Sequence, residues 1–136
     1  MDKRFQVSIY TPYGKYLVAE CDYLSVTTAM GPIGVLPNHA PLISTLEISK
    51  LTIKNGNHEL KYAIGGGVIN IKKDHSVTLL VDSIERSDEI DIERAKSSQK
   101  RALERINDPK TNEVDIARAK LSLLRALNRI NVSDDN

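Results

Sequence analysis

The sequence of 136 residues contains no Trp, one Phe and one Cys, and it has no long apolar run. The single Cys21 excludes an intramolecular disulfide and a cysteine-based zinc cluster, and it fits a reducing compartment. No stretch of about 18 consecutive apolar residues occurs, so we expect no segment that spans a bilayer and no signal peptide. If the protein works at a membrane, a partner must hold it there.

The charges are nearly balanced, since 19 Lys and Arg against 18 Asp and Glu give a formal net charge of +1. Aromatic residues make up only 4% of the chain, which leaves few side chains for stacking on bases. Both features argue against a nucleic-acid-binding module. That module stays an alternative, because a β-barrel with an arginine-striped pair of helices could present a basic groove.

Short runs of alternating apolar residues predict β-strands from Phe5 to about Val81. Phe5, Val7 and Ile9 share one face of an extended segment that ends at a turn over 11–14. The pair Asn55-Gly56 predicts the centre of a tight hairpin turn, because both central residues need positive φ there. Further runs lie at 24–28, 51–53, 60–64, 69–71 and 77–81. We therefore predict that residues 1–86 form a flattened β-sandwich or barrel of about ten short strands.

Helical periodicity replaces the alternation after Glu85 and predicts two helices. Asp88 with Asp91, and Asn112 with Asp115, place a capping residue and an acid three positions apart at the expected helix starts. Pro109 separates the helices, and so short a link indicates an antiparallel hairpin. We therefore predict a helical hairpin over residues 87–136. The second helix has leucines on more than one face, so we expect the hairpin to pack on something else: Leu121, Leu123, Leu124 and Leu127.

The hairpin is an internal repeat, in which DIERAKSSQKRALERI (91–106) aligns with DIARAKLSLLRALNRI (115–130). Each copy carries a stripe of three arginines next to small alanines that would let the helices approach closely. In the first copy an acid lies three residues from each arginine, whereas Arg125 and Arg129 have no acid at i±3 or i±4. Such stripes are commonly solvated faces, but two unpaired guanidinium groups one turn apart also suit phosphate or carboxylates. The stripes are Arg94, Arg101 and Arg105, then Arg118, Arg125 and Arg129.

Neither the histidines nor the triple glycine predicts catalysis. His39 lies between Pro37 and Pro41 with no Ser or Cys nucleophile motif nearby, so we interpret it as a turn residue. The glycines at 65–67 are not followed by a helix pattern, which favours a β-bulge or a close backbone approach over a phosphate loop. His-based zinc spacing is absent. We expect no catalytic residue, no metal site and no enzymatic activity.

The segment GPIGVLPNHAPLI (31–43) closely resembles the signature loop of the ε subunits of bacterial F-type ATP synthases. VSIYTPYG (7–14), YAIGGGV (62–68) and IDIERA (90–95) are also similar to motifs of that family, in their usual order. The resemblance covers essentially the whole chain and implies a β-sandwich followed by a helical hairpin. Two departures are Val68, where many members have an aromatic residue, and Met30-Gly31-Pro32, which lacks an acidic residue often found near the c ring.

The resemblance implies a non-catalytic rotor subunit in the central stalk, peripheral on the cytoplasmic face of the bacterial cell membrane. The β-domain would bind the γ subunit and touch the c-subunit ring, so that proton flow drives ATP synthesis. The hairpin would extend along γ into the α/β catalytic head and restrain ATP hydrolysis. Nucleic acid is not an implied partner, and membrane contact runs through partners only. The implied partner-binding residues are Met30, Gly31, Pro32, Pro37, Asn38, His39, Pro41 and Leu42.

The resemblance also implies that the folded hairpin binds ATP as a regulatory ligand, with no cofactor required. Its arginines would neutralise the triphosphate, and its acids would meet the ribose or orient the arginines. The chain has no GxxxxGK[ST] motif, so this would not be a P-loop site and hydrolysis is not expected. A free-standing ATP sensor without a rotor partner is the alternative. The matching residues are Glu85, Ile90, Asp91, Arg94, Ala95, Arg101, Arg125 and Arg129.

Overall fold

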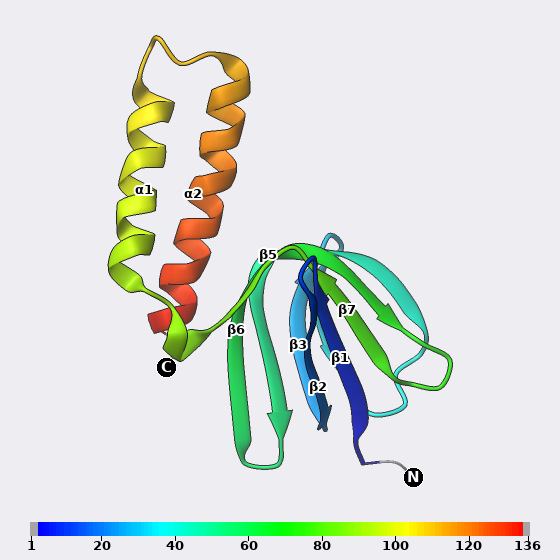
Figure 1. Cartoon of the computed structure of the whole chain (residues 1–136). Helices are drawn as coiled ribbons and strands as arrows, with labels where there is room; N and C mark the ends of the chain where they lie inside the picture. Colours follow the sequence, from blue (N-terminus) through cyan, green and yellow to red (C-terminus); the bar gives the residue numbers. More distant parts are fainter. Residues whose placement is uncertain (1–2, 135–136) are drawn as a thin grey trace. The chain divides into compact units, whose positions relative to one another are not determined.

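The computed structural model describes residues 3–134, which form two compact units that meet in sequence between Arg86 and Ser87 (Figure 1). Each unit is described by itself. The first contains strands β1 (Phe5–Thr11), β2 (Gly14–Cys21), β3 (Tyr23–Thr28), β4 (Gly31–Val35), β5 (Leu42–Asn55), β6 (His58–Ile71), β7 (Val77–Val81) and β8 (Ile84–Arg86). The second contains a 3-10 turn, η1 (Ser87–Glu89), and helices α1 (Ile92–Asn107) and α2 (Glu113–Asp134).

The predicted fold class, a β-structure followed by a helical hairpin, is confirmed, but the described part of the chain has eight strands rather than about ten. Part of the difference lies in β5 and β6, which are continuous strands of 14 residues each where the sequence suggested shorter pieces. The glycines at 65–67 bend β6 without ending it. The sequence also missed β4, which occupies the first residues of the expected signature loop.

The strands of the first unit form one sheet in the order β2-β1-β7-β6-β5-β3-β4, with β8 paired to β6. Strands from both ends of this order contribute to a single core, because Cys21 of β2 and Val35 of β4 belong to the same buried cluster. The sheet therefore curls on itself and packs its inner faces together, as a β-sandwich does. Pro32 lies in β4, an edge strand, which is where a sheet tolerates a residue without an N–H.

The glycines at 65–67 lie where the backbone of β6 closely approaches a neighbouring strand, as the sequence predicted. Gly66 and Gly67 have φ of 99° and 147°, and a Cβ at Gly67 would collide with the carbonyl oxygen of Leu80. The β5–β6 ladder skips Gly66, whose carbonyl instead accepts the amide of Asp82 at 3.0 Å. These glycines therefore let β6 change its partner from β8 to β7.

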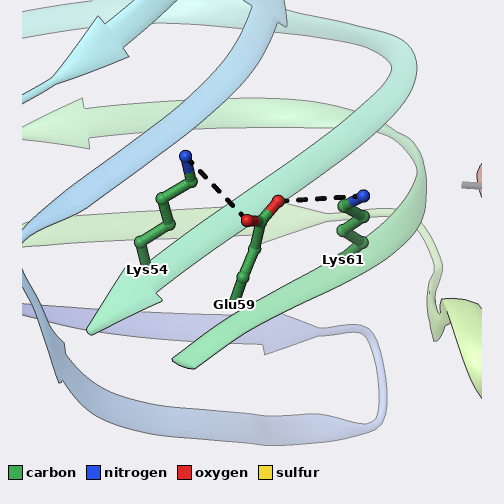
Figure 2. A network of polar contacts seen from close by, with 3 residues as sticks. All are labelled: Lys54, Glu59 and Lys61. Atoms are coloured by element: carbon green, nitrogen blue, oxygen red, sulfur yellow. Dashed lines mark ion pairs between the residues drawn. The ribbon is translucent and has the colours of Figure 1, made fainter. Parts of the chain in front are cut away.

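The β5–β6 turn differs by one position from the prediction. Asn55 pairs with His58, so the two loop residues are Gly56 and Asn57 rather than Asn55 and Gly56. Only Gly56 has positive φ, at 61°, which is the pattern of a type II′ turn. Beside the turn, Glu59 lies between the amines of Lys54 (3.9 Å) and Lys61 (3.8 Å), as Figure 2 shows. These distances indicate ion pairs of modest strength at the surface.

The start of the second helix is confirmed and the start of the first needs a correction. Asn112 Oδ1 accepts the amide of Asp115 at 2.8 Å, as a cap should. The first helix is capped by Asp91 rather than by Asp88, since Asp91 Oδ1 accepts the amide of Arg94 at 3.0 Å. Asp88 belongs to η1, which is a separate 3-10 turn.

The two helices meet along a seam of alanines, and this seam fixes their register. Ala95, Ala102, Ala119 and Ala126 are buried, and Ala102 and Ala119 line the same cavity. Ala95 lies seven residues before Ala102, and Ala126 lies seven residues after Ala119. Because the helices run antiparallel, Ala95 is therefore level with Ala126. Three of the four leucines are exposed in the described structure, and the expectation that the hairpin packs on something else stays a prediction: Leu121, Leu124 and Leu127.

Candidate functional site

All six arginines of the repeat lie on one face of the hairpin, which we call the arginine face. In each helix two arginines directly precede a seam alanine, as Arg94 precedes Ala95 and Arg125 precedes Ala126. One residue corresponds to a rotation of roughly 100° about the helix axis. In antiparallel helices, equal rotations away from the seam point to the same side. The remaining arginines, Arg105 and Arg129, follow a seam alanine by three residues and lie on that side too.

Along the hairpin five of these arginines divide into two groups, and the sixth, Arg118, pairs with Asp115. Arg101 and Arg105 form the loop-end pair, because they lie nearer to the connection between α1 and α2. The alanine register places Arg125 level with residue 96 of α1 and Arg129 level with residue 92. At about 1.5 Å per residue, the centres of the two pairs lie roughly 13 Å apart along the axis. Arg94 joins Arg125 and Arg129 in what we call the open-end group.

The ion pairs that the sequence predicted within the first helix do not form in the described part of the chain. Asp91 Oδ1 caps α1 by accepting the amide of Arg94. Arg101 Nη2 donates to Ser98 Oγ at 3.4 Å and does not pair with Glu104. Asp108 Oδ1 accepts the amide of Lys110 at 2.9 Å. Asp91 and Asp108 therefore accept backbone amides, and the guanidinium groups of the first copy make no ion pair with these acids.

The second copy also differs from its prediction. Arg125 is exposed and has no ion pair among residues 3–134, as its sequence neighbours suggest. Arg129 is half-buried and does take part in a polar or electrostatic interaction, so it is not unpaired. The absence of an acid at i±3 and i±4 therefore did not leave Arg129 without an interaction. Arg118 pairs with Asp115 at 3.9 Å, on an exposed stretch of α2.

The structure brings most of the predicted nucleotide-binding residues to the open end of the hairpin. Asp91 caps α1 and Arg94 and Ala95 lie in its first turn, and the register places them at the level of Arg125 and Arg129 in α2. Ala95 is buried in the seam, so its contribution is the close approach of the helices. Arg125 is level with residue 96 of α1, so Arg101 lies more than one helical turn nearer to the loop than Arg125 does. Glu85 belongs to β8 of the other unit, and the buried Ile90 precedes α1.

A cavity of about 190 Å³ lies at the loop end, between the two helices. The predicted set contains Arg101 but misses the other polar residues of this cavity. The internal repeat holds a signal for two of them, because Ser98 and Ser122 occupy the same place in the two copies. The lining residues are Ser98, Arg101, Ala102, Arg105, Ala119 and Ser122.

The predicted partner-binding residues fall on two surfaces rather than one loop. Met30, Gly31 and Pro32 lie at the β3–β4 turn, where Met30 is 92% exposed. The remaining five lie beyond the other end of β4, about 20 Å along an extended chain. There the exposed apolar residues Leu36 (59%) and Ile43 (72%) flank Pro37, Asn38, His39, Pro41 and Leu42.

The β4–β5 connection is held in shape by backbone contacts. Asn38 has a φ of 68°, and the amide of His39 donates to the carbonyl of Leu36 at 3.2 Å. His39 Nδ1 lies 2.7 Å from the carbonyl oxygen of Ala40, and His75 Nδ1 lies 3.1 Å from that of His39. These contacts support the interpretation of His39 as a turn residue.

Comparison with known proteins places both units in one family. The ATP synthase Delta/Epsilon chain β-sandwich domain matches residues 4–87, and the Delta/Epsilon chain long α-helix domain matches residues 88–134. A protein of Geobacter metallireducens named ATP synthase epsilon chain is 42% identical over 75% of this chain and 73% of its own. A second epsilon chain, from Bacillus mycoides, is 44% identical over 78% of this chain and 79% of its own. The chain belongs to the ATP synthase epsilon chain family.

Solved structures show the same fold as this epsilon chain at low sequence identity. A chain of the Euglena gracilis mitochondrial ATP synthase, solved as the OSCP/F1/c-ring assembly, matches with a TM-score of 0.85 and 18% identity. The match covers 94% of this chain and 80% of that one. A chain of the Tetrahymena thermophila central stalk and c-ring matches with a TM-score of 0.68 and 13% identity, over 97% of both chains.

Two further observations describe this epsilon chain. Among residues 3–134, no helix combines the length and the apolar character needed to cross a membrane. No group of three or more His, Cys, Asp or Glu residues in the same range is arranged to hold a metal ion.

Proposed function

We propose that this epsilon chain is a non-catalytic rotor subunit in the central stalk of a proton-translocating F-type ATP synthase. In this proposal the β-unit binds the γ subunit and touches the c-subunit ring, and the hairpin reaches the α/β catalytic head. The protein is peripheral, on the cytoplasmic face of the bacterial membrane, and is held there by its partners. Family membership and the family fold of both units carry the proposal.

The two surfaces of the β-unit support the partner contacts. Met30 at the β3–β4 turn and Leu36 and Ile43 beside the β4–β5 connection expose large apolar side chains. The connection is held in shape by the His39 and His75 contacts. Exposed apolar groups on a preorganised surface favour protein contacts, since little ordering remains to be done on binding.

We further propose that the open-end group of arginines binds the triphosphate of ATP and thereby regulates the hairpin. Arg94 and Arg125 come from different helices and reach the same level only while α1 and α2 lie side by side. ATP would therefore bind the folded hairpin and not an extended one. Such differential affinity is what a ligand needs to shift a two-state equilibrium. ATP would in this way hold the hairpin out of its inhibitory state.

Titration of the full chain with ATP, followed by NMR amide shifts, tests the regulatory site. We expect saturable shifts concentrated in 90–101 and 125–129, with GTP as the comparison ligand. Arg125→Gln should weaken binding about tenfold, because it removes a charge-assisted contact. Lys96→Gln is the matched control, since Lys96 is exposed at the same level as Arg125 but follows the seam alanine and so faces the other side. An equal loss of ATP affinity in both variants would mean that any positive charge on the hairpin has the same effect, and would contradict a specific site at Arg125.

Copurification tests the rotor assignment separately. A tagged chain expressed with the other subunits should bring down γ and the catalytic head. Exchanging Met30 or Ile43 for Asp should weaken this capture, because a charge would enter an apolar contact. A chain that binds ATP but captures no γ would contradict the rotor assignment and favour a free-standing ATP sensor.

A further inference from the structure

We propose that His75 is a positioning residue for partner binding, which fixes the β4–β5 connection in the shape that the partner recognises. The inference rests on the proposed contact between this connection and the γ subunit. It adds a residue that lies outside the predicted partner-binding set. His75 belongs to the β6–β7 turn over 72–76, and it is 36 residues away from His39 in the sequence.

The β4–β5 connection contains a turn of its own. The amide of His39 donates to the carbonyl of Leu36 at 3.2 Å, with Pro37 and Asn38 between them, and Asn38 has a φ of 68°. Proline at the second position and positive φ at the third are the features of a type II turn. None of the residues 36–41 belongs to a strand. The place of this turn on the β-unit therefore depends on contacts with other segments.

His75 supplies such a contact. Its Nδ1 lies 3.1 Å from the carbonyl oxygen of His39. Because a carbonyl oxygen only accepts, Nδ1 carries the proton and donates it. In the described part of the chain, this is the one side-chain hydrogen bond that reaches residues 36–41 from another segment. It fixes the peptide directly after the type II turn, between the exposed apolar side chains of Leu36 and Ile43.

The backbone on both sides of this contact has a conformation that few residues adopt. Among residues 3–134, Asn38 and His75 are the two residues other than glycine with positive φ, at 68° and 72°. Such conformations persist where the surrounding structure imposes them, and they concentrate at functional positions. In the β6–β7 turn, Ser76 donates its amide at 3.0 Å and its hydroxyl at 2.6 Å to Asp74 Oδ1. The turn thus holds the His75 ring from a fixed backbone.

A connection that is already ordered in the free chain binds its partner more tightly, because less ordering remains to be done on binding. The hydrogen bond from His75 should therefore contribute to the affinity for γ even if the ring itself does not touch γ. Substitutions that keep or remove the donor separate these two roles. Asn and Asp suit this position, since both tolerate positive φ.

Binding of the full chain to the γ-containing head of the same synthase, prepared without its own epsilon chain, tests the proposal. His75→Asp should raise the Kd about three- to tenfold, because a carboxylate cannot donate. His75→Asn should stay within about twofold of the wild type, since its amide nitrogen is bonded to Cγ as Nδ1 is, and still donates.

Lys73→Gln is the matched control, because it lowers the net charge by one, as His75→Asp does with a neutral ring. Lys73 lies in the same turn, is exposed and has no side-chain contact in the described chain. This variant should change the Kd less than about twofold. Tyrosine fluorescence verifies that the β-unit is folded in each variant. While the unit stays folded, a loss of stability alone leaves the Kd unchanged.

The free chain gives an independent readout. The ¹⁵N shifts of the neutral His75 ring should show the Nδ1–H tautomer. The amide signals of residues 36–41 should move in His75→Asp and stay near their wild-type positions in His75→Asn. This measurement needs no partner.

Three outcomes would overturn the proposal: an Nε2–H tautomer of His75, a Kd for His75→Asp equal to that of the wild type, or equal losses of affinity in His75→Asp and either His75→Asn or Lys73→Gln. The proposed function fails differently. A wild-type chain that does not bind the γ-containing head would contradict the rotor assignment. Tight binding that ignores His75→Asp would leave that assignment intact and contradict the role of His75 alone.

Discussion

The β-unit and the hairpin bury different kinds of side chain. The β-unit has a core of large aliphatic residues, among them Ile9, Leu24 and Ile69, which are 0% exposed. The buried apolar residues within α1 and α2 are four alanines and Val132, while larger ones such as Leu103 and Leu124 are exposed. An alanine buries one methyl group, so the seam gains little from the hydrophobic effect.

This difference suggests that the β-unit is the stable platform and the hairpin the adjustable part. Helices depend mainly on tertiary packing for their stability, and α1 has only 16 residues. A hairpin joined by alanines can therefore respond to a ligand or a partner that adds a few kcal/mol. Elements that move in regulation belong to the less stable parts of proteins.

The composition offers a separate probe for each unit. All five tyrosines lie before residue 63 and there is no Trp, so tyrosine fluorescence reports on the β-unit. Both α-helices follow residue 91, so circular dichroism at 222 nm reports mainly on the hairpin. The predictions below use these two signals to test the comparison.

The largest expected effect is a cavity in the β-core. Leu24→Ala should lower the free energy of unfolding by about 2–5 kcal/mol, because Leu24 is fully buried. Leu124→Ala in α2 should cost less than about 0.5 kcal/mol, since Leu124 is 56% exposed. Urea unfolding followed by both signals gives the two values. A large loss for Leu124→Ala would mean that this leucine carries core packing.

Enlarging a seam alanine should have the next largest effect. Ala102→Leu and its repeat counterpart Ala126→Leu should each destabilise the hairpin by about 1–3 kcal/mol, because the helices approach closely there. Ala117→Leu, at an exposed position of α2, is the control and should be nearly neutral. The 222 nm signal should report the loss. An unchanged midpoint in both seam variants would disprove the close approach.

Alkaline pH should lower the free energy of unfolding of the β-unit, which contains Cys21, and not that of the hairpin. Burial, with a smaller contribution from the carboxylate of Asp22, raises the pKa of the Cys21 thiol from 9.0 to about 12. The unfolded chain loses this proton first, so the stabilisation is complete below pH 9 and falls as pH rises toward 12. The slope is at most about 1.4 kcal/mol per pH unit. Urea unfolding between pH 8 and 10 measures it, and Cys21→Ala should remove this slope.

The helix caps should show the smallest stability effect. Asp91→Ala removes the cap of α1 and should cost about 1 kcal/mol. Its repeat counterpart Asp115 lies inside α2 and pairs with Arg118 at 3.9 Å on an exposed surface. Asp115→Ala should cost only about 0.3–0.5 kcal/mol. Thermal unfolding at 222 nm compares them, and equal costs would mean that the two copies use this acid alike.

The sequence predicted well what local patterns control. Alternation identified β1, β3 and β7, and helical spacing identified both helices with the cap at Asn112. Glycine composition identified the irregular backbone of β6. Each of these features depends on residues close together in the chain, whose conformational preferences are readable one segment at a time.

The sequence failed where contacts between distant segments decide. The loop-end cavity is lined by side chains from both α1 and α2, and so depends on how these segments meet in space. The family motif includes all three arginines of the open-end group, whose binding role stays a prediction, and it does not include Arg105 and Ser122, which line the loop-end cavity. A linear match identifies residues one by one, whereas a cavity is defined by the side chains that surround it.

Urea unfolding followed by both signals, with and without saturating ATP, tests the central claim most directly. We predict that the 222 nm transition precedes the tyrosine transition, and that ATP moves the 222 nm transition to higher urea while the tyrosine transition stays in place. At a ligand concentration of 100 Kd the shift should correspond to about 2.7 kcal/mol. Coincident transitions that ATP leaves unchanged would contradict a stable platform with a ligand-adjustable hairpin.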